Sequence, residues 1–339
     1  MSVYAGKKIL VTGGAGSIGS EVVRQLIKHN PKEIRIFGRG EERLAALRKE
    51  LKDNANVIFF VGDIRDESRL EEAMAGADIV FHAAAMKHVD ICEYNPREAI
   101  KTNVLGTDNV ITYALKNNVE RAILISTDKA TEPTNTMGAT KMLAERLMAE
   151  ADAFRAKGKR TIFCATRFGN VLGSAGSILP LFEKSIKEKK EIPVTDEEMT
   201  RFVMTIPEAA GLVLEAGRIA KGGETFVLKM KSLRLRDLIS VIIDIVCRKY
   251  GYKTSDIKKN IIGLRPGEKI HEGLISETEC PRTLETDSFY IIISPLNPKK
   301  ADYSGIGAKK AEVTAYNSNG IKLLTRDEIR HLIEKEGLL

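Results

Sequence analysis

Short apolar runs alternate with longer, mixed segments along the first part of the chain. Strands of a buried sheet are expected where Val, Ile and Phe gather, at 8–12, 33–37, 57–61 and 78–82. Helices are expected between them, first over 20–29 and then over 41–52. This alternation of strands and helices predicts an α/β protein with a doubly wound parallel sheet of the Rossmann type.

The middle of the chain predicts a ligand site at the end of a strand. The apolar run Ala122–Ile125 is followed at once by the polar residues 126–129. Ligands of open parallel sheets bind at the carboxyl ends of the strands, where these side chains would project. A proline then breaks the chain, and a helix is expected over 137–150. Lys141 would lie one turn after Met137 on the same face of that helix.

The rest of the pattern predicts three more elements. A long helix is expected over 98–117, a strand over 160–166 and an amphipathic helix over 327–335. A chain of 339 residues can bury a large core. It can do so as one large domain or as a nucleotide-binding domain with a smaller companion.

A glycine-rich loop joins the first strand to the first helix. It reads Gly13-Gly14-Ala15-Gly16-Ser17-Ile18-Gly19. The glycines permit a tight turn and a close approach of the backbone to a pyrophosphate, which then lies on the helix N-terminus. The position between a strand and a helix makes this a dinucleotide-binding loop. Its predicted cofactor contacts are Gly13, Gly16, Ser17, Ile18 and Gly19.

The end of the second strand bears on the choice of cofactor. NAD-binding versions of this fold place an acidic residue about 20 positions after the glycines, where it binds the ribose hydroxyls. Arg39 occupies that place, and its guanidinium would pair with a 2′-phosphate. NADP is therefore expected rather than NAD, although Arg43 or Glu41 could alter that choice.

The composition is that of an ordinary soluble enzyme, with 43% hydrophobic and 29% charged residues. No apolar run approaches the roughly 20 residues that span a bilayer. Too few residues precede the first strand for a signal peptide. We therefore expect a cytoplasmic protein with no membrane insertion.

Charge and cysteine content limit the partners further. The net charge of +7 is spread among interspersed acidic residues, so no nucleic acid is predicted to bind. A basic surface favours substrates that carry phosphate. The four cysteines, Cys92, Cys164, Cys247 and Cys280, contain no C-x-x-C pair. They are expected to be reduced structural thiols, and no metal site is predicted.

Several motifs occur together and point to one family. Thr127-Asp128-Lys129 follows the fifth expected strand, and His82-Ala83-Ala84-Ala85-Met86-Lys87 spans the end of the fourth. Thr102–Thr107, Met199–Phe202 and Arg265–Lys269 are further matches. With the glycine-rich start, the chain resembles the extended short-chain dehydrogenases/reductases, in the UDP-N-acetylglucosamine 4,6-dehydratase branch of CapD-like polysaccharide biosynthesis proteins. The resemblance covers roughly residues 7 to 295.

The resemblance implies two domains. An NADP-binding Rossmann domain would comprise 1–168 with parts of 195–230. A smaller C-terminal α/β domain that binds the UDP-sugar would comprise 169–194 and 231–300. No role is assigned to the tail, 301–339. In this superfamily the two long helices of the first domain commonly pair with their symmetry mates, so a homodimer or higher homo-oligomer is expected.

The resemblance also implies ligand contacts. Asp63 and Ile64 would border the adenine, and the cofactor would lie against Ala83, Ala84 and Lys141. Substrate contacts would come from Lys87, Asn170, Arg201, Arg265 and Glu268. The two arginines are natural diphosphate ligands because a guanidinium can make bidentate contacts.

The family reaction removes water from UDP-N-acetylglucosamine and gives a UDP-4-keto-6-deoxy sugar. Hydride leaves C4 for NADP⁺, C5 loses a proton as the 6-hydroxyl departs, and hydride returns to C6. Lys129 is the candidate base at C5, and Asp128 is the candidate acid at C6. Burial and a nearby positive nicotinamide or Lys141 are expected to lower the pKa of Lys129, and burial is expected to raise that of Asp128. If the two groups instead formed an exposed ion pair, both would stay charged and the reaction would fail.

Position 137 departs from the family's Tyr-x-x-x-Lys pair because it holds Met137. A thioether cannot accept the 4-hydroxyl proton, so Thr127, or a water held by Thr127 and Lys141, would relay it. Met137 and the run 204–210 resemble the branch that retains the C5 configuration. The short format and the motif at 199–202 resemble the inverting branch, which is slightly favoured.

Three other functions fit parts of the pattern. A UDP-sugar 4-epimerase shares the fold and the C4 oxidation, but it has no need of the Asp128–Lys129 pair and usually keeps tyrosine at position 137. The chain could instead catalyse one part of a split dehydration and C5-epimerisation. A protein that binds NADP without catalysis is the last alternative.

Overall fold

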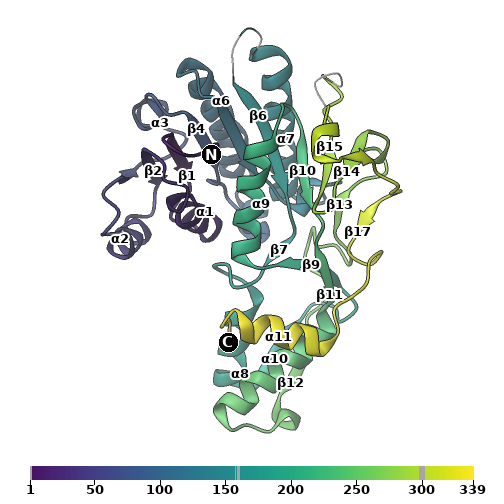
Figure 1. The fold of residues 1–339 in the computed structure, drawn as a ribbon. Coiled ribbons are helices and arrows are strands. Elements are labelled where there is room, and N and C mark those ends of the chain that lie inside the picture. Colours follow the sequence, from purple (N-terminus) through teal and green to yellow (C-terminus); the bar gives the residue numbers. More distant parts are fainter. Residues whose placement is uncertain (1, 157, 159–160, 298–301) are drawn as a thin grey trace.

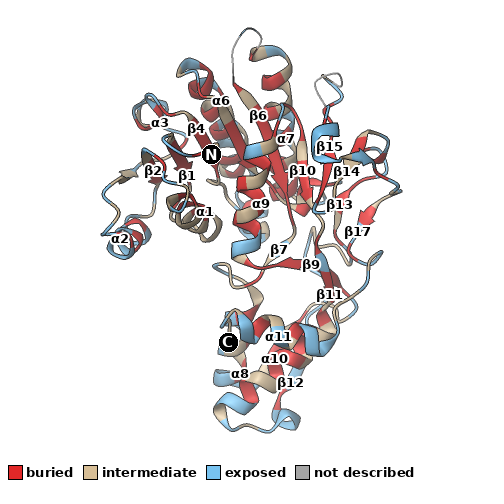
Figure 2. Ribbon diagram, in the orientation of Figure 1, coloured by how far each residue is buried: buried red, intermediate tan, exposed pale blue. Residues whose placement is uncertain are grey.

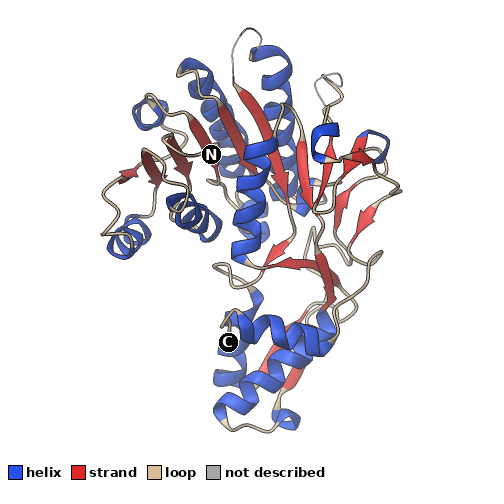
Figure 3. Ribbon diagram, in the orientation of Figure 1, coloured by secondary structure: helices blue, strands red, loops and turns tan. Residues whose placement is uncertain are grey.

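One large sheet forms the centre of the protein. The computed structural model describes residues 2–156, 158, 161–297 and 302–339. Within these ranges a ten-stranded sheet has the order β16-β14-β15-β10-β6-β5-β4-β1-β2-β3 (Figures 1 and 3). The strands are β1 (Lys8–Thr12), β2 (Glu33–Gly38), β3 (Val57–Val61), β4 (Ile79–His82), β5 (Arg121–Ile125), β6 (Ile162–Arg167), β10 (Thr225–Leu228), β14 (Thr283–Glu285), β15 (Phe289–Ile292) and β16 (Lys309–Lys310).

The strand order identifies the fold. Strands β3, β2, β1, β4, β5, β6 and β10 are parallel neighbours, in the order of a doubly wound dinucleotide-binding sheet. Strands β15, β14 and β16 extend this sheet in antiparallel fashion. The predicted α/β Rossmann fold is therefore confirmed.

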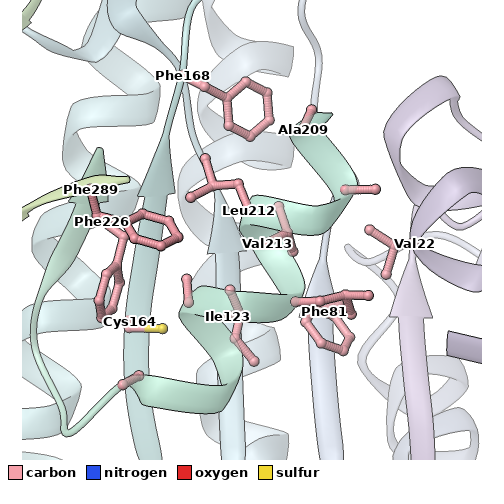
Figure 4. Packing of buried hydrophobic residues seen from close by; sticks show 14 of the residues in the cluster. Val22, Phe81, Ile123, Cys164, Phe168, Ala209, Leu212, Val213, Phe226 and Phe289 are labelled. Carbon is pink, nitrogen blue, oxygen red and sulfur yellow. The ribbon is translucent and has the colours of Figure 1, made fainter. Parts of the chain in front are cut away.

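Helices cover both faces of the sheet because alternate strand residues point to opposite sides. Ile9 and Val11 of β1 pack with α1 (Ser17–Ile27), α2 (Glu41–Glu50) and α9 (Ile206–Ile219). Figure 4 shows Leu212 and Val213 of α9 in this layer. On the other face Leu10 packs with α3 (Glu67–Met74), α6 (Gly106–Lys116) and α7 (Thr136–Glu150).

A second hydrophobic cluster lies at the bottom of Figure 1. It joins α8 (Ile178–Lys189), β8 (Glu191–Val194), α10 (Leu235–Tyr250) and α11 (Arg326–Lys335). Figure 2 shows buried residues on these helices. Between this cluster and the main sheet lies a three-stranded sheet of β7 (Asn170–Val171), β9 (Thr200–Met204) and β11 (Lys231–Arg234).

The C-terminal tail takes part in this fold. Strand β17 (Tyr316–Asn317) pairs with β13 (Gly273–Ile275), and α11 buries Ile329 and Ile333 in the second cluster. The tail thus packs on both β13 and α10. The domain boundaries stay a prediction, and the one placed at residue 300 lies outside the described residues.

Several predicted elements differ from the structure at their ends. Helix α1 begins at Ser17 rather than at residue 20, because Gly16 takes the extended N-cap conformation. The helix predicted over 98–117 is interrupted by a π-helical segment, Ile100–Leu105. There the Asn103 side chain bonds both backbone groups of Met86, a tertiary contact that the local pattern does not contain. The strand predicted from residue 160 begins at Ile162, and residue 160 itself lies outside the described part.

All four cysteines lie in the described part of the chain, where they are buried and form no disulfide, as predicted. Among the helices of the described ranges, none is long and apolar enough to cross a bilayer. The cytoplasmic location stays a prediction.

Candidate functional site

The glycine-rich loop forms a cradle at the carboxyl ends of β1 and β4. Gly13 has a φ of +68°, and a Cβ on it would lie only 2.6 Å from the Ala84 nitrogen. A Cβ on Gly19 would run into the Gly13 carbonyl oxygen. Side chains are thus excluded where a dinucleotide pyrophosphate needs to approach the backbone and the start of α1. The residues present fit a bound NAD or NADP.

Arg39 and Asp63 lie together at the neighbouring strand ends. The Arg39 guanidinium is 54% exposed and reaches Asp63 Oδ2 at 3.4 Å. Arg65 holds the same carboxylate more closely, at 2.6 Å, so Arg39 keeps most of its donors free. Ile64 is buried, and its carbonyl accepts a hydrogen bond from Asn109. An exposed cation therefore lies where a 2′-phosphate is predicted.

Two of the predicted catalytic residues, Asp128 and Lys129, lie on a 3₁₀ turn, Asp128–Ala130, soon after β5, and Thr127 is the N-cap of this turn. Asp128 is fully buried, and its Oδ1 accepts hydrogen bonds from the Thr127 hydroxyl at 2.7 Å and from Lys129 Nζ at 3.0 Å. Asp128 Oδ2 is buried and has no hydrogen-bond partner among the described residues. The carboxylate is buried and the Lys129 side chain is 22% exposed, so the two form a part-buried ion pair rather than an exposed one.

Glu272 is a buried acidic residue at this site that the sequence reading missed. Its Oε1 lies 3.5 Å from Lys129 Nζ and 3.9 Å from Arg201 Nε, and its side chain is 3% exposed. Glu272 follows the motif Arg265–Lys269 by three residues, and this proximity was the only sequence feature that pointed to it. What the sequence could not show is that this segment folds back against the turn after β5.

The pKa of Lys129 is shifted in the direction opposite to the one expected. Burial tends to lower its pKa, but the carboxylates of Asp128 and Glu272 outweigh burial and raise it. The predicted lowering was therefore wrong, because Asp128 and Glu272 together oppose the effect of burial. The pKa of Glu272 is itself raised by burial and by the neighbouring Asp128 charge, against the influence of Lys129, Arg201 and Lys269.

Met137 and Lys141 both lie buried on α7. Lys141 Nζ donates a hydrogen bond to the Ile125 carbonyl at 2.7 Å, and burial lowers its pKa to about 8, against the opposing influence of Glu145. Met137 packs with Cys92 and Ala99 in a small apolar cluster. Lys141 thus contacts the last residue of β5, close to the turn that carries Asp128 and Lys129.

Lys87 lies across from the glycine-rich loop. Its ammonium group donates a hydrogen bond to the Ala175 carbonyl, and burial together with Arg43 lowers its pKa. Ala175 N donates to the Ser17 hydroxyl at 3.0 Å, so the loop after β7 bridges Lys87 and the start of α1. Asn170 is exposed at the start of β7, just before this bridging loop.

Arg201 on β9 contacts the segment that carries the motif 265–269. The Arg201 guanidinium donates to the backbone carbonyls of Thr200, Lys269 and Ile270, and its side chain is 13% exposed. Arg265 is exposed, and its backbone N–H donates to the Glu268 carboxylate at 3.1 Å. The Gly267 carbonyl accepts from Thr134 and Asn135, which docks the motif on the loop between β5 and α7.

Comparisons with known proteins agree with this architecture. The family model described as "Polysaccharide biosynthesis protein" matches residues 9–294. The chain is 48% identical over 336 residues to "Uncharacterized membrane protein MJ1061" of Methanocaldococcus jannaschii, covering 99% of this chain and 98% of that protein. It is 38% identical over 339 residues to "UDP-glucose 4-epimerase" of Rickettsia felis, covering 98% and 96%.

Two further similarities concern a longer relative and a solved structure. The chain is 46% identical over 280 residues to "Capsular polysaccharide biosynthesis protein CapD" of Staphylococcus aureus, covering 80% of this chain and 46% of CapD. The X-ray structure of Pen from Bacillus thuringiensis superposes with a TM-score of 0.93 at 43% identity and covers 99% of both chains.

Proposed function

The chain belongs to the polysaccharide biosynthesis protein family, CapD-like members of the NAD(P)-binding epimerase and dehydratase fold, and we propose that it is an NADP-dependent UDP-N-acetylglucosamine 4,6-dehydratase. The observation that carries this proposal is the part-buried Asp128–Lys129 ion pair at the carboxyl end of β5. Elimination of water needs a base at C5 and an acid at C6 of the same sugar ring. Epimerisation at C4 needs neither of these two groups.

Bound NADP would supply the hydride acceptor for C4 and the hydride donor for C6. Gly13, Gly16, Ser17, Ile18 and Gly19 would hold its pyrophosphate, and Ala83 and Ala84 would line its path. The exposed guanidinium of Arg39 would bind the 2′-phosphate, and Asp63 and Ile64 would border the adenine. NAD, which lacks this phosphate, is the less favoured cofactor.

The protonation of the Asp128–Lys129 pair is central to the elimination. At rest the pair holds an ammonium and a carboxylate with Nζ and Oδ1 3.0 Å apart. Transfer of one proton from Nζ to Oδ1 produces a neutral amine and a protonated carboxyl together. Lys129 can then take the C5 proton while Asp128 gives its proton to the departing 6-hydroxyl.

The proton of the 4-hydroxyl needs another acceptor because Met137 cannot take it. We assign this step to Thr127, or to a water held by Thr127 and Lys141. The Thr127 hydroxyl already donates to Asp128, and the pKa of Lys141 is lowered to about 8 by burial. Inversion at C5 is slightly favoured over retention.

The UDP moiety would lie near β9 and the motif 265–269. Arg201 and Arg265 would bind the diphosphate, and Lys87, Asn170 and Glu268 would complete the substrate contacts. The homodimer is proposed to form through the helices around α6 and α7. Exposed apolar side chains on their outer surface support it, namely Ile100, Leu105, Leu143 and Phe154.

A UDP-sugar 4-epimerase is the second candidate. The observation in its favour is the similarity, over nearly the whole chain, to relatives named UDP-glucose 4-epimerase. Both reactions begin with oxidation at C4, so the cofactor cradle fits either of them.

Proton NMR of the protein with UDP-N-acetylglucosamine and NADP in D₂O separates the candidates. A new 6-methyl signal with deuterium at C5 supports dehydration, and the couplings of the ring protons report the C5 configuration. A C4 epimer without a methyl signal supports the epimerase. Unchanged substrate, with NADP bound, contradicts both.

A further inference from the structure

Lys129 lies between two carboxylates that come from distant parts of the chain. Asp128 Oδ1 is 3.0 Å from Lys129 Nζ, and Glu272 Oε1 is 3.5 Å from the same nitrogen. Asp128 is fully buried and Glu272 is 3% exposed. In both carboxyl groups the second oxygen is buried and has no hydrogen-bond partner in the part of the chain that the structure describes.

The position of Glu272 is fixed by its backbone. Its N–H donates to the Ser318 hydroxyl at 3.0 Å, and its carbonyl accepts from the Ser318 N–H at 2.8 Å. The Ser318 hydroxyl in turn lies 2.7 Å from the Thr200 hydroxyl on β9. The tail therefore holds the Glu272 backbone in place, and the Glu272 carboxylate faces Lys129.

The charged groups around Glu272 come from three elements. The turn after β5 contributes Asp128 and Lys129, β9 contributes Arg201, and its own segment contributes Lys269. Lys269 Nζ donates to the Thr131 carbonyl, and Arg201 donates to three backbone carbonyls. Lys129 is the cation closest to Glu272 among those for which an ion pair is seen in the described chain.

We propose that Glu272 is a positioning residue that holds the Lys129 ammonium group beside Asp128 and so sets the pH at which Lys129 becomes a neutral base. The proposal rests on the proposed function, because it concerns the base of the elimination. Two carboxylates around one amine favour its charged form more than one carboxylate does. Removal of the Glu272 charge should therefore make Lys129 neutral at lower pH.

Competitive labelling measures this without substrate. Acetic anhydride reacts only with neutral amines, and the Lys129 side chain is 22% exposed, so a small reagent can reach it. The labelled fraction of Lys129, read by mass spectrometry at a series of pH values, gives its titration curve. In Glu272→Gln we expect the curve to move to lower pH by about one unit, a roughly tenfold larger neutral fraction below the midpoint.

Two further variants serve as controls. Glu272→Asp keeps the charge on a shorter side chain, so its curve should lie between those of the wild type and Glu272→Gln. It also tests the proposal if Glu272→Gln does not fold. Glu279→Gln removes another buried carboxylate, which pairs with Arg167 instead, and should leave the Lys129 curve in place. An unmoved curve in both Glu272 variants, or an equal movement in Glu279→Gln, would overturn the proposal.

The pH profile of dehydration in the same variants then separates the role of Glu272 from the proposed dehydratase function. If Lys129 is the base, the rising limb of the kcat profile should move with the labelling curve. If the labelling curve shifts but neither the wild type nor the variants dehydrate the sugar, the proposed function is contradicted. The placement of Glu272 beside Lys129 is still supported in that case. Labelling that shifts while the kcat limb stays fixed would overturn the role of Glu272 in setting the base.

Discussion

Replacement of Lys129 by methionine tests the buried charge cluster directly. The variant keeps the apolar stem of the side chain and removes the ammonium group. In the wild type, Lys129 Nζ lies 3.0 Å from Asp128 Oδ1 and 3.5 Å from Glu272 Oε1. Without this cation the two carboxylates would repel each other. Both carboxylates stay out of water, with exposed fractions of 0% and 3%.

The expected loss of stability follows from this burial. Removal of one partner from a buried ion pair commonly costs about 3–5 kcal/mol, because the remaining charge is left uncompensated. Lys129 itself is 22% exposed, so water can partly replace it, and we expect the lower end, about 3 kcal/mol. Lys101→Met serves as control, since it removes an exposed lysine that pairs with Glu98 on the surface and should change stability by less than about 1 kcal/mol.

The loss should depend on pH with a definite sign. The pKa of Glu272 already lies above its ordinary value of 4.5 because of burial and Asp128, and loss of Lys129 raises it further. A carboxyl group whose pKa is raised in the folded state stabilises the protein at low pH and loses that contribution as the pH rises through the folded-state pKa. Urea midpoints should therefore differ more between variant and wild type at about pH 8 than at about pH 5. An equal difference at both values would refute the buried cluster.

Two further variants test the cofactor cradle. Gly13→Ala should weaken NADPH binding roughly tenfold or more in a fluorescence titration, because its Cβ meets the Ala84 backbone, whereas Gly76→Ala, with a similar φ of +65° and open space, should not. Arg39→Asp should weaken NADP binding roughly tenfold or more and spare NAD, since only NADP has the 2′-phosphate. Equal losses for both cofactors would show that another residue binds the phosphate.

The strands and the glycine-rich loop could be predicted because their signals are local. The bounds of β1 and β3 match the apolar runs residue for residue, and the cradle follows from glycines between a strand and a helix. The π-helical interruption after Ala99 could not be predicted, because it accompanies side-chain bonds from Asn103 to the loop after β4.

The site was only partly predictable for the same reason. Thr127, Asp128 and Lys129 are adjacent in the sequence, so their proximity needs no tertiary knowledge. Glu272 reaches Lys129 only in the folded chain, where it directly precedes β13, the strand that pairs with β17. The expectation that burial lowers the pKa of Lys129 failed because the carboxylates of Asp128 and Glu272 outweigh burial.

The most direct test of the account follows deuterium at C5 of UDP-N-acetylglucosamine in D₂O, in the wild type and in Lys129→Met. We expect the wild type to give a 6-methyl product that carries deuterium at C5. Lys129→Met should give neither signal while it still binds UDP and NADP. Formation of the same deuterated methyl product by Lys129→Met at the wild-type rate would contradict the assignment of Lys129 as the base.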